Sequence, residues 1–184
     1  MTDGSVTFVT GRRGSGKTTW IKNHVARLSR VLVWDWRGEY SFPPISTPKI
    51  LEMFRSQTFQ FTYRPDYTAD LPEQFNVLAY CILHMQAAQN FTLIVDEAYM
   101  VCPQNSEGEL GKMIRLTRPK NINLIVSSQR PCLVPGVFRS ESDQFIIFHL
   151  HNPADVYLIR SIFGEHAAEK VSHLHKFQYL NLSH

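Results

Sequence analysis

The segment Gly11–Thr18 constrains the fold most, because it reads Gly-Arg-Arg-Gly-Ser-Gly-Lys-Thr and matches the pattern GxxxxGK[ST] in full. The β-branched run Ser5–Thr10 precedes it, and Lys17–Ser29 follows with the spacing of an amphipathic helix. Glycines let such a loop curl so that its N–H groups and the helix N-terminus face phosphate oxygens. We therefore predict a nucleoside triphosphate site formed by Gly11, Arg12, Arg13, Gly14, Ser15, Gly16, Lys17, Thr18 and Thr19.

Two side chains of this loop suit the chemistry of a triphosphate. A lysine at the position of Lys17 can reach the β- and γ-phosphates, and the Thr18 hydroxyl can ligate Mg²⁺. The loop itself does not fix the base, but the chain has no NKxD motif, which weakens a GTPase interpretation. The residues therefore predict a nucleoside triphosphate with Mg²⁺ and leave the base open.

An acidic pair follows a second apolar strand. Phe91–Val95 is strongly apolar, and Asp96 and Glu97 come directly after it. Ligands of open α/β sheets bind at the carboxyl ends of the strands, which places this pair beside the phosphate loop. We predict that Asp96 holds Mg²⁺, together with Thr18, and that Glu97 polarises the attacking water as a general base.

A third apolar strand, Ile122–Ser127, brings Gln129 to the same edge, where its amide could sense the γ-phosphate or the lytic water. The stretch from 110 to 140 carries six basic residues and no acid. An arginine supplied by a neighbouring subunit often neutralises charge in phosphoryl transfer. We predict Arg118 for that role, with Arg115 as the second choice. The other basic residues fit DNA-phosphate contacts and a solvated basic face equally well.

Apolar strands separated by helices predict a three-layer α/β fold with a mainly parallel sheet, in a single domain over residues 1–184. The cluster Trp34–Arg37 ends another strand at the ligand edge, where it either contacts nucleotide or substrate or simply packs. The remaining strands are expected at Val31–Trp34, Thr58–Tyr63, Gln144–Leu150 and Tyr179–Leu182, and the remaining helices at Lys49–Arg55, Leu71–Asn90, Glu109–Thr117, Ala154–Phe163 and His166–His173.

The helix expected at Leu71–Asn90 contains only one charged residue, Glu73. An ordinary surface helix has a charged face. This helix is therefore expected either to be buried on several sides or to be covered by a partner subunit.

Charge and cysteine content narrow the class of protein. A net charge of +3 excludes a histone-like polycation but not a local basic patch. The three cysteines have no CxxC spacing, which favours a reducing compartment over a disulfide framework. No signal peptide or membrane-spanning segment is visible, so we expect a soluble protein of a reducing cytosol.

The motifs together resemble those of the FtsK–HerA superfamily of P-loop ATPases. The segments that carry the likeness are GRRGSGKTT, VLVWDWRGEY with its D-x-x-G-E-Y pattern, LIVDEAY, TRPKNINLIVSSQRP and QFIIFHLHNPADVYLIRSIFG. Within that superfamily, the compact chain is most similar to the genome-packaging ATPases of tailless icosahedral viruses with an internal membrane. The likeness runs from Val6 to about Leu182.

This resemblance implies a RecA-like sheet in which the Gln129 strand lies between the phosphate-loop strand and the Asp96 strand. It also implies a homo-oligomeric ring, commonly a hexamer, with double-stranded DNA in a central channel and a capsid or portal-vertex protein as partner. The chain shows no membrane segment, β-barrel or winged-helix module of the larger members, so we expect a bare motor.

Two rival functions share the phosphate loop. A nucleotide or shikimate-type kinase has a similar length, and Asp35–Arg37 could hold its acceptor, but a water-activating Glu97 suits hydrolysis better. A toxin-like or assembly ATPase of filamentous phages has a similar opening motif, but that class normally carries a membrane-spanning segment. We therefore expect an ATP-driven DNA translocase.

Overall fold

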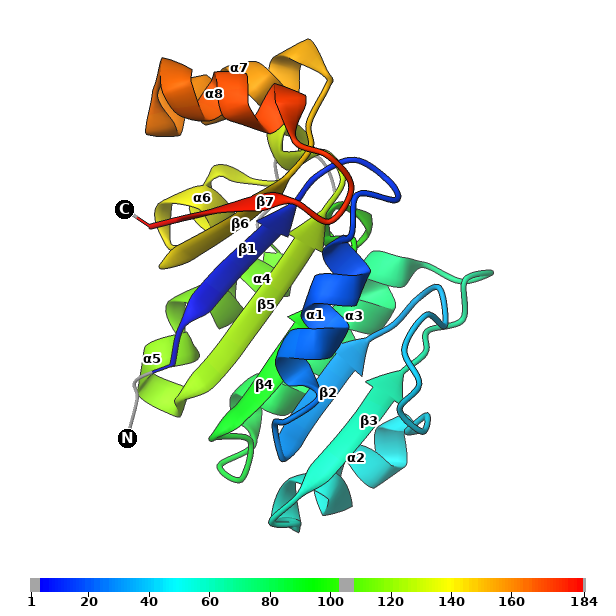
Figure 1. Cartoon of the computed structure of the whole chain (residues 1–184). Coiled ribbons are helices and arrows are strands. Elements are labelled where there is room, and N and C mark those ends of the chain that lie inside the picture. The colour runs from blue at the N-terminus through cyan, green and yellow to red at the C-terminus, as the bar shows by residue number, and fades with distance from the viewer. Residues whose placement is uncertain (1–3, 103–107, 184) are drawn as a thin grey trace.

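The computed structural model describes residues 4–102 and 108–183 and is built around one seven-stranded sheet (Figure 1). The strand order is β3-β2-β4-β5-β1-β6-β7, and every neighbouring pair is parallel except β6 with β7. The expected α/β fold with a mainly parallel sheet is confirmed. The strands are β1 Val6–Thr10, β2 Arg30–Trp34, β3 Phe59–Tyr63, β4 Phe91–Val95, β5 Ile122–Ser128, β6 Gln144–Phe148 and β7 Tyr179–Leu182.

Strand β5 pairs with β4 on one side and with β1 on the other. The predicted insertion of the Gln129 strand between the phosphate-loop strand and the Asp96 strand is therefore confirmed. Because these strands are parallel, their carboxyl ends lie side by side, and the loops that follow them meet at one edge of the sheet.

Helices cover both faces of the sheet (Figure 1). Side chains alternate between the faces: Leu32, Leu93 and Leu124 belong to one buried cluster, whereas Val31, Ile94 and Ile125 belong to the other with Ile21 of α1. Both faces are apolar, which is why the central strands read as continuous hydrophobic runs. The helices are α1 Lys17–Val25, α2 Thr47–Arg55, α3 Leu71–His84, α4 Gly108–Arg115, α5 Thr117–Lys120, α6 Gly136–Ser140, α7 Pro153–Phe163 and α8 Glu165–His173, with 3-10 turns η1 Ala98–Met100 and η2 Pro131–Leu133.

Several predicted helix ends are wrong. The helix expected to reach Asn90 ends at His84, because Met85 is extended and Asn90 takes a positive φ of 56°. The helix expected to reach Ser29 ends at Val25, which leaves a short link to β2. The helix expected at Glu109–Thr117 does stop before Pro119, but it ends at Arg115. A separate short helix, α5, follows with Pro119 in its first turn, where a missing N–H is tolerated.

Helix α3 is not buried on several sides within the chain. Its inner face packs in the core through residues that include Phe75 and Ile82, but Val77 and Tyr80 are 50% and 58% exposed on the opposite face. The scarcity of charge on this helix is thus not explained by packing inside the chain, and the predicted partner subunit stays a prediction. None of the helices in the described residues has the length and hydropathy that crossing a bilayer requires.

Candidate active site

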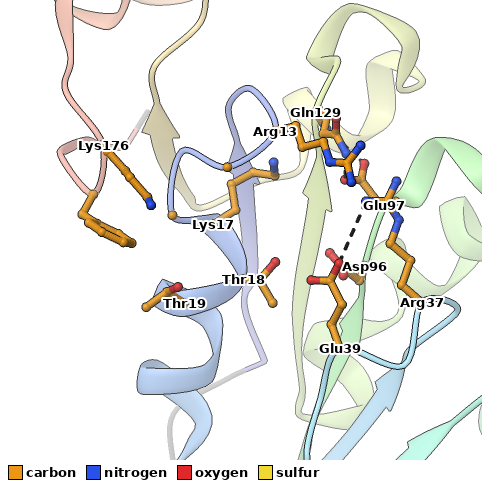
Figure 2. Close-up of a pocket in the computed structure, with 13 residues that line it drawn as sticks. Arg13, Lys17, Thr18, Thr19, Arg37, Glu39, Asp96, Glu97, Gln129 and Lys176 are labelled. Atoms are coloured by element: carbon orange, nitrogen blue, oxygen red, sulfur yellow. Dashed lines mark hydrogen bonds and ion pairs between the residues drawn. The ribbon is translucent and has the colours of Figure 1, made fainter.

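A pocket of about 350 Å³ lies where the loops after β1, β4 and β5 meet (Figure 2). It brings together the three constellations predicted separately from the sequence: the phosphate loop, the acidic pair and Gln129. The predicted residues that line it are Arg13, Gly14, Gly16, Lys17, Thr18, Thr19, Asp96, Glu97 and Gln129.

The other predicted loop residues hold the loop in place. Gly11 and Ser15 are buried beneath it, while the Arg12 amide donates to the carbonyl of His149 at 2.8 Å. The Nζ of Lys17 donates to the carbonyl of Gly11 at 2.8 Å and to that of Arg12 at 3.3 Å. These bonds keep the ammonium group inside the loop, at the place where phosphate oxygens would replace the carbonyls as acceptors.

Lys17 is only 6% exposed, and this burial lowers the pKa of its ammonium group. The carboxylates of Glu97 and Asp96 act in the opposite direction and raise it. The buried Lys17 ammonium group suits a negatively charged ligand, and the acidic pair beside it suits a cation bound to that ligand.

Asp96 ends β4 with a carboxylate that is 4% exposed and accepts a hydrogen bond from the Ser127 hydroxyl of β5. Burial raises its pKa from 3.8 to about 6, the hydrogen bond from Ser127 lowers it, and the neighbouring Glu97 adds to the rise. The Thr18 hydroxyl lines the same pocket. A carboxylate and a hydroxyl at a phosphate site are oxygen ligands of the kind that Mg²⁺ prefers, so these residues fit the predicted metal.

Glu97 is held by Gln129. The Gln129 amide nitrogen Nε2 donates to one carboxylate oxygen of Glu97 at 2.6 Å, and its backbone N–H donates to the other at 3.1 Å. Glu97 itself has a left-handed φ of 54° and its backbone N–H donates to Ser127 at 3.1 Å. The predicted base and the predicted sensor are therefore in direct contact, and a ligand that attracts the Gln129 amide would free the Glu97 carboxylate.

The loop after β2 adds two pocket residues, Arg37 and Glu39. From the sequence, Arg37 was expected either to contact a ligand or to pack, and Glu39 was given no role in the site. Asp35 is 1% exposed and accepts the backbone N–H groups of Glu39 at 2.8 Å and Tyr40 at 3.0 Å. Asp35 therefore shapes this loop rather than contacting a ligand. Figure 2 shows Arg37 extending toward Glu97, and its guanidinium lies 4.0 Å from the Glu39 carboxylate.

The turn between α8 and β7 contributes Lys176 and Phe177, which the sequence analysis missed. No motif marks them, because the strand order alone brings residues so far along the chain beside the loop after β1. The sequence offered one indication of these two pocket residues: a basic residue followed by an aromatic one lies just before the last predicted strand.

Arg118 does not lie in the pocket of its own chain. It precedes β5, and its guanidinium donates to Asp143, which precedes β6, at 2.9 Å. Both residues are thus at the amino ends of parallel strands, and Figure 1 shows α5 at the opposite end of the sheet from the loop between β1 and α1. Arg115 lies one helical turn earlier and lines the same small hollow as Arg118. This placement leaves only a neighbouring subunit's site within reach, so the trans role stays a prediction.

The basic stretch from 110 to 140 is largely engaged in bonds within the chain. Lys120 donates to the carbonyls of Ile82 and Met85, and Lys112 pairs with Glu109 at 2.6 Å. Arg130 donates to Asp155 at 2.7 Å. These bonds give three of the basic residues partners within the chain, whereas the sequence left DNA contact and a solvated basic face equally open.

Neither a family model nor a curated protein matches the sequence, but solved structures do. The genome packaging NTPase B204 of Sulfolobus turreted icosahedral virus 2, solved with ATP-gammaS, is 24% identical, with a TM-score of 0.79 over 97% of this chain and 92% of its own. This chain shares its fold with that packaging NTPase. VirB4 of Thermoanaerobacter pseudethanolicus matches with a TM-score of 0.67 at 12% identity, covering 98% of this chain and 89% of its own.

A toxin domain is also among the structures that match. The N-terminal domain of zonular occludens toxin from Neisseria meningitidis is 20% identical, with a TM-score of 0.51 over 83% of this chain and 79% of that domain. The match to the packaging NTPase is both longer and better superposed. At these identities, the likeness establishes a shared fold.

Proposed function

We propose that this chain is a Mg²⁺-dependent ATP hydrolase that drives DNA translocation and packages viral genomic DNA into a preformed capsid. The observation that carries the proposal is the single pocket in which Lys17, Asp96, Glu97 and Gln129 converge. The fold shared with a viral genome packaging NTPase along nearly the whole of both chains supports the packaging role.

Each residue of the pocket has a separate role in the proposed hydrolysis. Lys17 and the backbone N–H groups of the phosphate loop bind the phosphates, and Asp96 with Thr18 would hold Mg²⁺, which supplies charge neutralisation when bound. Glu97 accepts a proton from water as the water oxygen bonds to the γ-phosphorus and the bond to the β–γ bridging oxygen breaks. The Gln129 side chain donates to one carboxylate oxygen of Glu97, so transfer of its amide to the γ-phosphate would free that oxygen to act as the base.

The partners of the proposal follow from the same likeness. A homo-oligomeric ring, a hexamer as in many superfamily members, would surround double-stranded DNA in a central channel and dock on a capsid or portal-vertex protein. Packaging would then take place in the host cell cytoplasm or at the assembling virion. The exposed apolar side chains of α3, Val77 and Tyr80, are compatible with burial between subunits.

The decisive experiment measures phosphate release from ATP with and without double-stranded DNA, and with nucleoside monophosphates as alternative acceptors. We expect Mg²⁺-dependent phosphate release that DNA stimulates. ADP formed together with a phosphorylated acceptor, without free phosphate, would instead establish a kinase. Hydrolysis that DNA leaves unchanged would contradict the translocase.

A further inference from the structure

The turn that connects α8 to β7 is attached directly to the phosphate loop. The Phe177 N–H donates to the carbonyl of Ser15 at 2.8 Å, and the His149 ring is hydrogen-bonded through Nδ1 to the carbonyl of Leu174 at 2.7 Å. Within the turn, the Gln178 N–H donates to the carbonyl of His175 at 3.0 Å. The turn is thus held in a defined position over the loop by bonds at each end.

Phe177 and Gly16 are matched to each other at this contact. Phe177 has a φ of 70°, which is unfavourable for a large side chain and is often found at binding sites. A Cβ added to Gly16 would lie 2.8 Å from the Phe177 ring. Glycine at this position therefore serves the packing of the turn as well as the curl of the loop.

A second hollow of about 400 Å³ adjoins the phosphate pocket and shares Gly16, Thr19 and Phe177 with it. Its walls are mostly rings: Trp20 stacks on His24 at 4.9 Å, and Tyr179 lies edge-on to Trp20 at 6.3 Å. The other lining residues are Asn23 and Phe148. A flat, apolar ligand with polar edges suits such a hollow.

The phosphate pocket has two distinct ends. Figure 2 shows Asp96, Glu97, Gln129 and Arg37 at one end, and Lys176 with Thr19 at the other, across the phosphate loop. The acidic pair and Gln129 mark the end at which the terminal phosphate reacts. A nucleotide with its terminal phosphate at that end would place its other phosphates toward Lys176 and its remainder past Thr19 toward the aromatic hollow.

We propose that the turn 174–178 forms the second half of the nucleotide site, with Lys176 binding the non-terminal phosphates and the nucleobase occupying the aromatic hollow beside Phe177. The proposal deepens the assigned ATP site and rests on the nucleotide-binding part of the proposed function. Lys176 has no acidic partner among the residues that the structure describes, and its ammonium group extends toward the phosphate loop (Figure 2). The edges of the base would face Asn23, whose amide both donates and accepts hydrogen bonds.

Isothermal titration without DNA tests both halves of this assignment, with ATP, ADP and inorganic tripolyphosphate as ligands. Lys176→Met should weaken all three by about tenfold, because it removes one charge-assisted hydrogen bond to phosphates that they share. Phe177→Leu keeps an apolar side chain but loses the stacking surface. It should weaken ATP and ADP by about fivefold to tenfold and leave tripolyphosphate unchanged, since tripolyphosphate has no base.

Matched controls come from exposed residues of the neighbouring helices. Lys170→Met on α8 removes a charge near the turn, and Tyr157→Leu on α7 removes an aromatic ring that is 66% exposed. The assignment of Lys176 is overturned if Lys176→Met resembles Lys170→Met, or if it weakens ATP but not ADP. The assignment of the base is overturned if Phe177→Leu weakens tripolyphosphate as much as ATP.

These outcomes are separate from those of the proposed function. If Lys17→Ala loses ATP binding while the turn variants bind like their controls, the site stands and only the turn's role falls. If the turn variants behave as expected but DNA leaves hydrolysis unchanged, the translocase falls and the nucleotide assignment stands. Retained tripolyphosphate binding by Phe177→Leu also shows that this variant is folded.

Discussion

Glu97 is the residue whose geometry bears most directly on mechanism, because Gln129 occupies both of its carboxylate oxygens. A general base that is hydrogen-bonded in the resting site must be released before it can accept a proton. If Glu97 is the base and Gln129 the sensor, as proposed, the contact would couple arrival of the γ-phosphate at Gln129 to activation of water by Glu97.

Substituting Glu97 should separate binding from chemistry. Glu97→Gln keeps the shape of the side chain and one of the two acceptor oxygens that Gln129 contacts, but it cannot take up a proton. We therefore expect near-normal ATP affinity and turnover at least ~100-fold lower. Titration and steady-state phosphate release measure the two quantities, with the exposed Glu169→Gln as the control. Equal loss of binding and turnover would make Glu97 structural.

The ionised carboxylate of Asp96 is expected to lower the free energy of unfolding, by an amount that depends on pH. Its pKa rises from 3.8 to about 6 on burial, so the folded protein holds this proton more tightly than the unfolded chain does. The group therefore stabilises the fold below about pH 4, relative to neutral pH, and this contribution is lost as the pH rises through 6. At pH 7.5 the ionised carboxylate disfavours the fold by on the order of 2 to 3 kcal/mol.

Asp96→Asn should consequently raise the free energy of unfolding at pH 7.5, by up to that amount, while abolishing Mg²⁺-dependent hydrolysis. The amide can still accept the hydrogen bond from Ser127, but it cannot ionise. Chemical denaturation at pH 4 and pH 7.5, with a chelator present and no nucleotide, measures the effect, which should shrink at the lower pH. A variant that is less stable than the parent at both values would show that the carboxylate is favourable where it stands.

At the scale of elements, the segment after β5 is tied to helix α7 by Asp155. This carboxylate is 1% exposed and accepts bonds from the Arg130 guanidinium at 2.7 Å and from the Cys132 N–H at 3.1 Å. Arg130 adjoins Gln129 in the chain. A charged group buried at a helix start therefore fixes the loop that carries the predicted sensor.

Removing this tie should affect both stability and turnover. We expect Asp155→Ala to destabilise the fold by about 1 to 3 kcal/mol, a moderate value because Arg130 is 41% exposed on its side chain and can be hydrated. Hydrolysis should fall more than ATP affinity, since Gln129 loses its fixed position. Glu165→Ala breaks the exposed pair with Arg160 and should cost less than 1 kcal/mol. Similar losses from the two variants would contradict a specific role for Asp155.

The elements that sequence predicted well are those whose signal is local. Apolar runs such as Phe91–Val95 followed by polar residues locate the strands, and the spacing of Gly11–Thr18 locates the phosphate loop. Parallel pairing then brings Asp96, Glu97 and Gln129 to one edge without further information. The contact between Glu97 and Gln129 was not predicted, because it depends on side-chain orientation after the strands have ended.

The features that sequence missed depend on long-range packing. Lys176 and Phe177 reach the pocket only because β7 pairs antiparallel with β6 at the end of the sheet. The end of α3 at His84 is set by the loop whose Asn90 N–H donates to the carbonyl of Asn121. Nothing in the residues immediately around either position signals such a partner.

At the scale of the whole molecule, helix α5, which contains Arg118, and the β1–α1 loop, which lines the pocket, lie at opposite ends of the sheet (Figure 1). A single chain therefore cannot bring this arginine to its own γ-phosphate. In a ring whose subunits meet head to tail, the amino end of one sheet can face the carboxyl end of the next. The pair with Asp143 would then be exchanged for a pair with phosphate on assembly.

Mixing two inactive variants tests this arrangement. Arg118→Ala keeps its own phosphate loop but offers no arginine, whereas Lys17→Ala offers the arginine but cannot bind phosphate productively. We expect each variant alone to lose at least ~100-fold in turnover. Equimolar mixed rings should recover a substantial part, because an Arg118→Ala subunit with its intact phosphate loop can receive the arginine of a neighbouring Lys17→Ala subunit. Steady-state phosphate release on the mixture measures the recovery.

The control mixture combines Lys17→Ala with Glu97→Gln. Each of these variants lacks a residue of its own pocket, which a neighbouring subunit cannot supply. No interface in those rings contains a complete site, so activity should stay at the level of the separate variants. Recovery confined to the Arg118→Ala mixture would assign the arginine to a trans role. If Arg118→Ala rings stay inactive after mixing, while Arg115→Ala rings are rescued, the trans arginine is Arg115, and failure of both would leave Arg118 as a structural partner of Asp143.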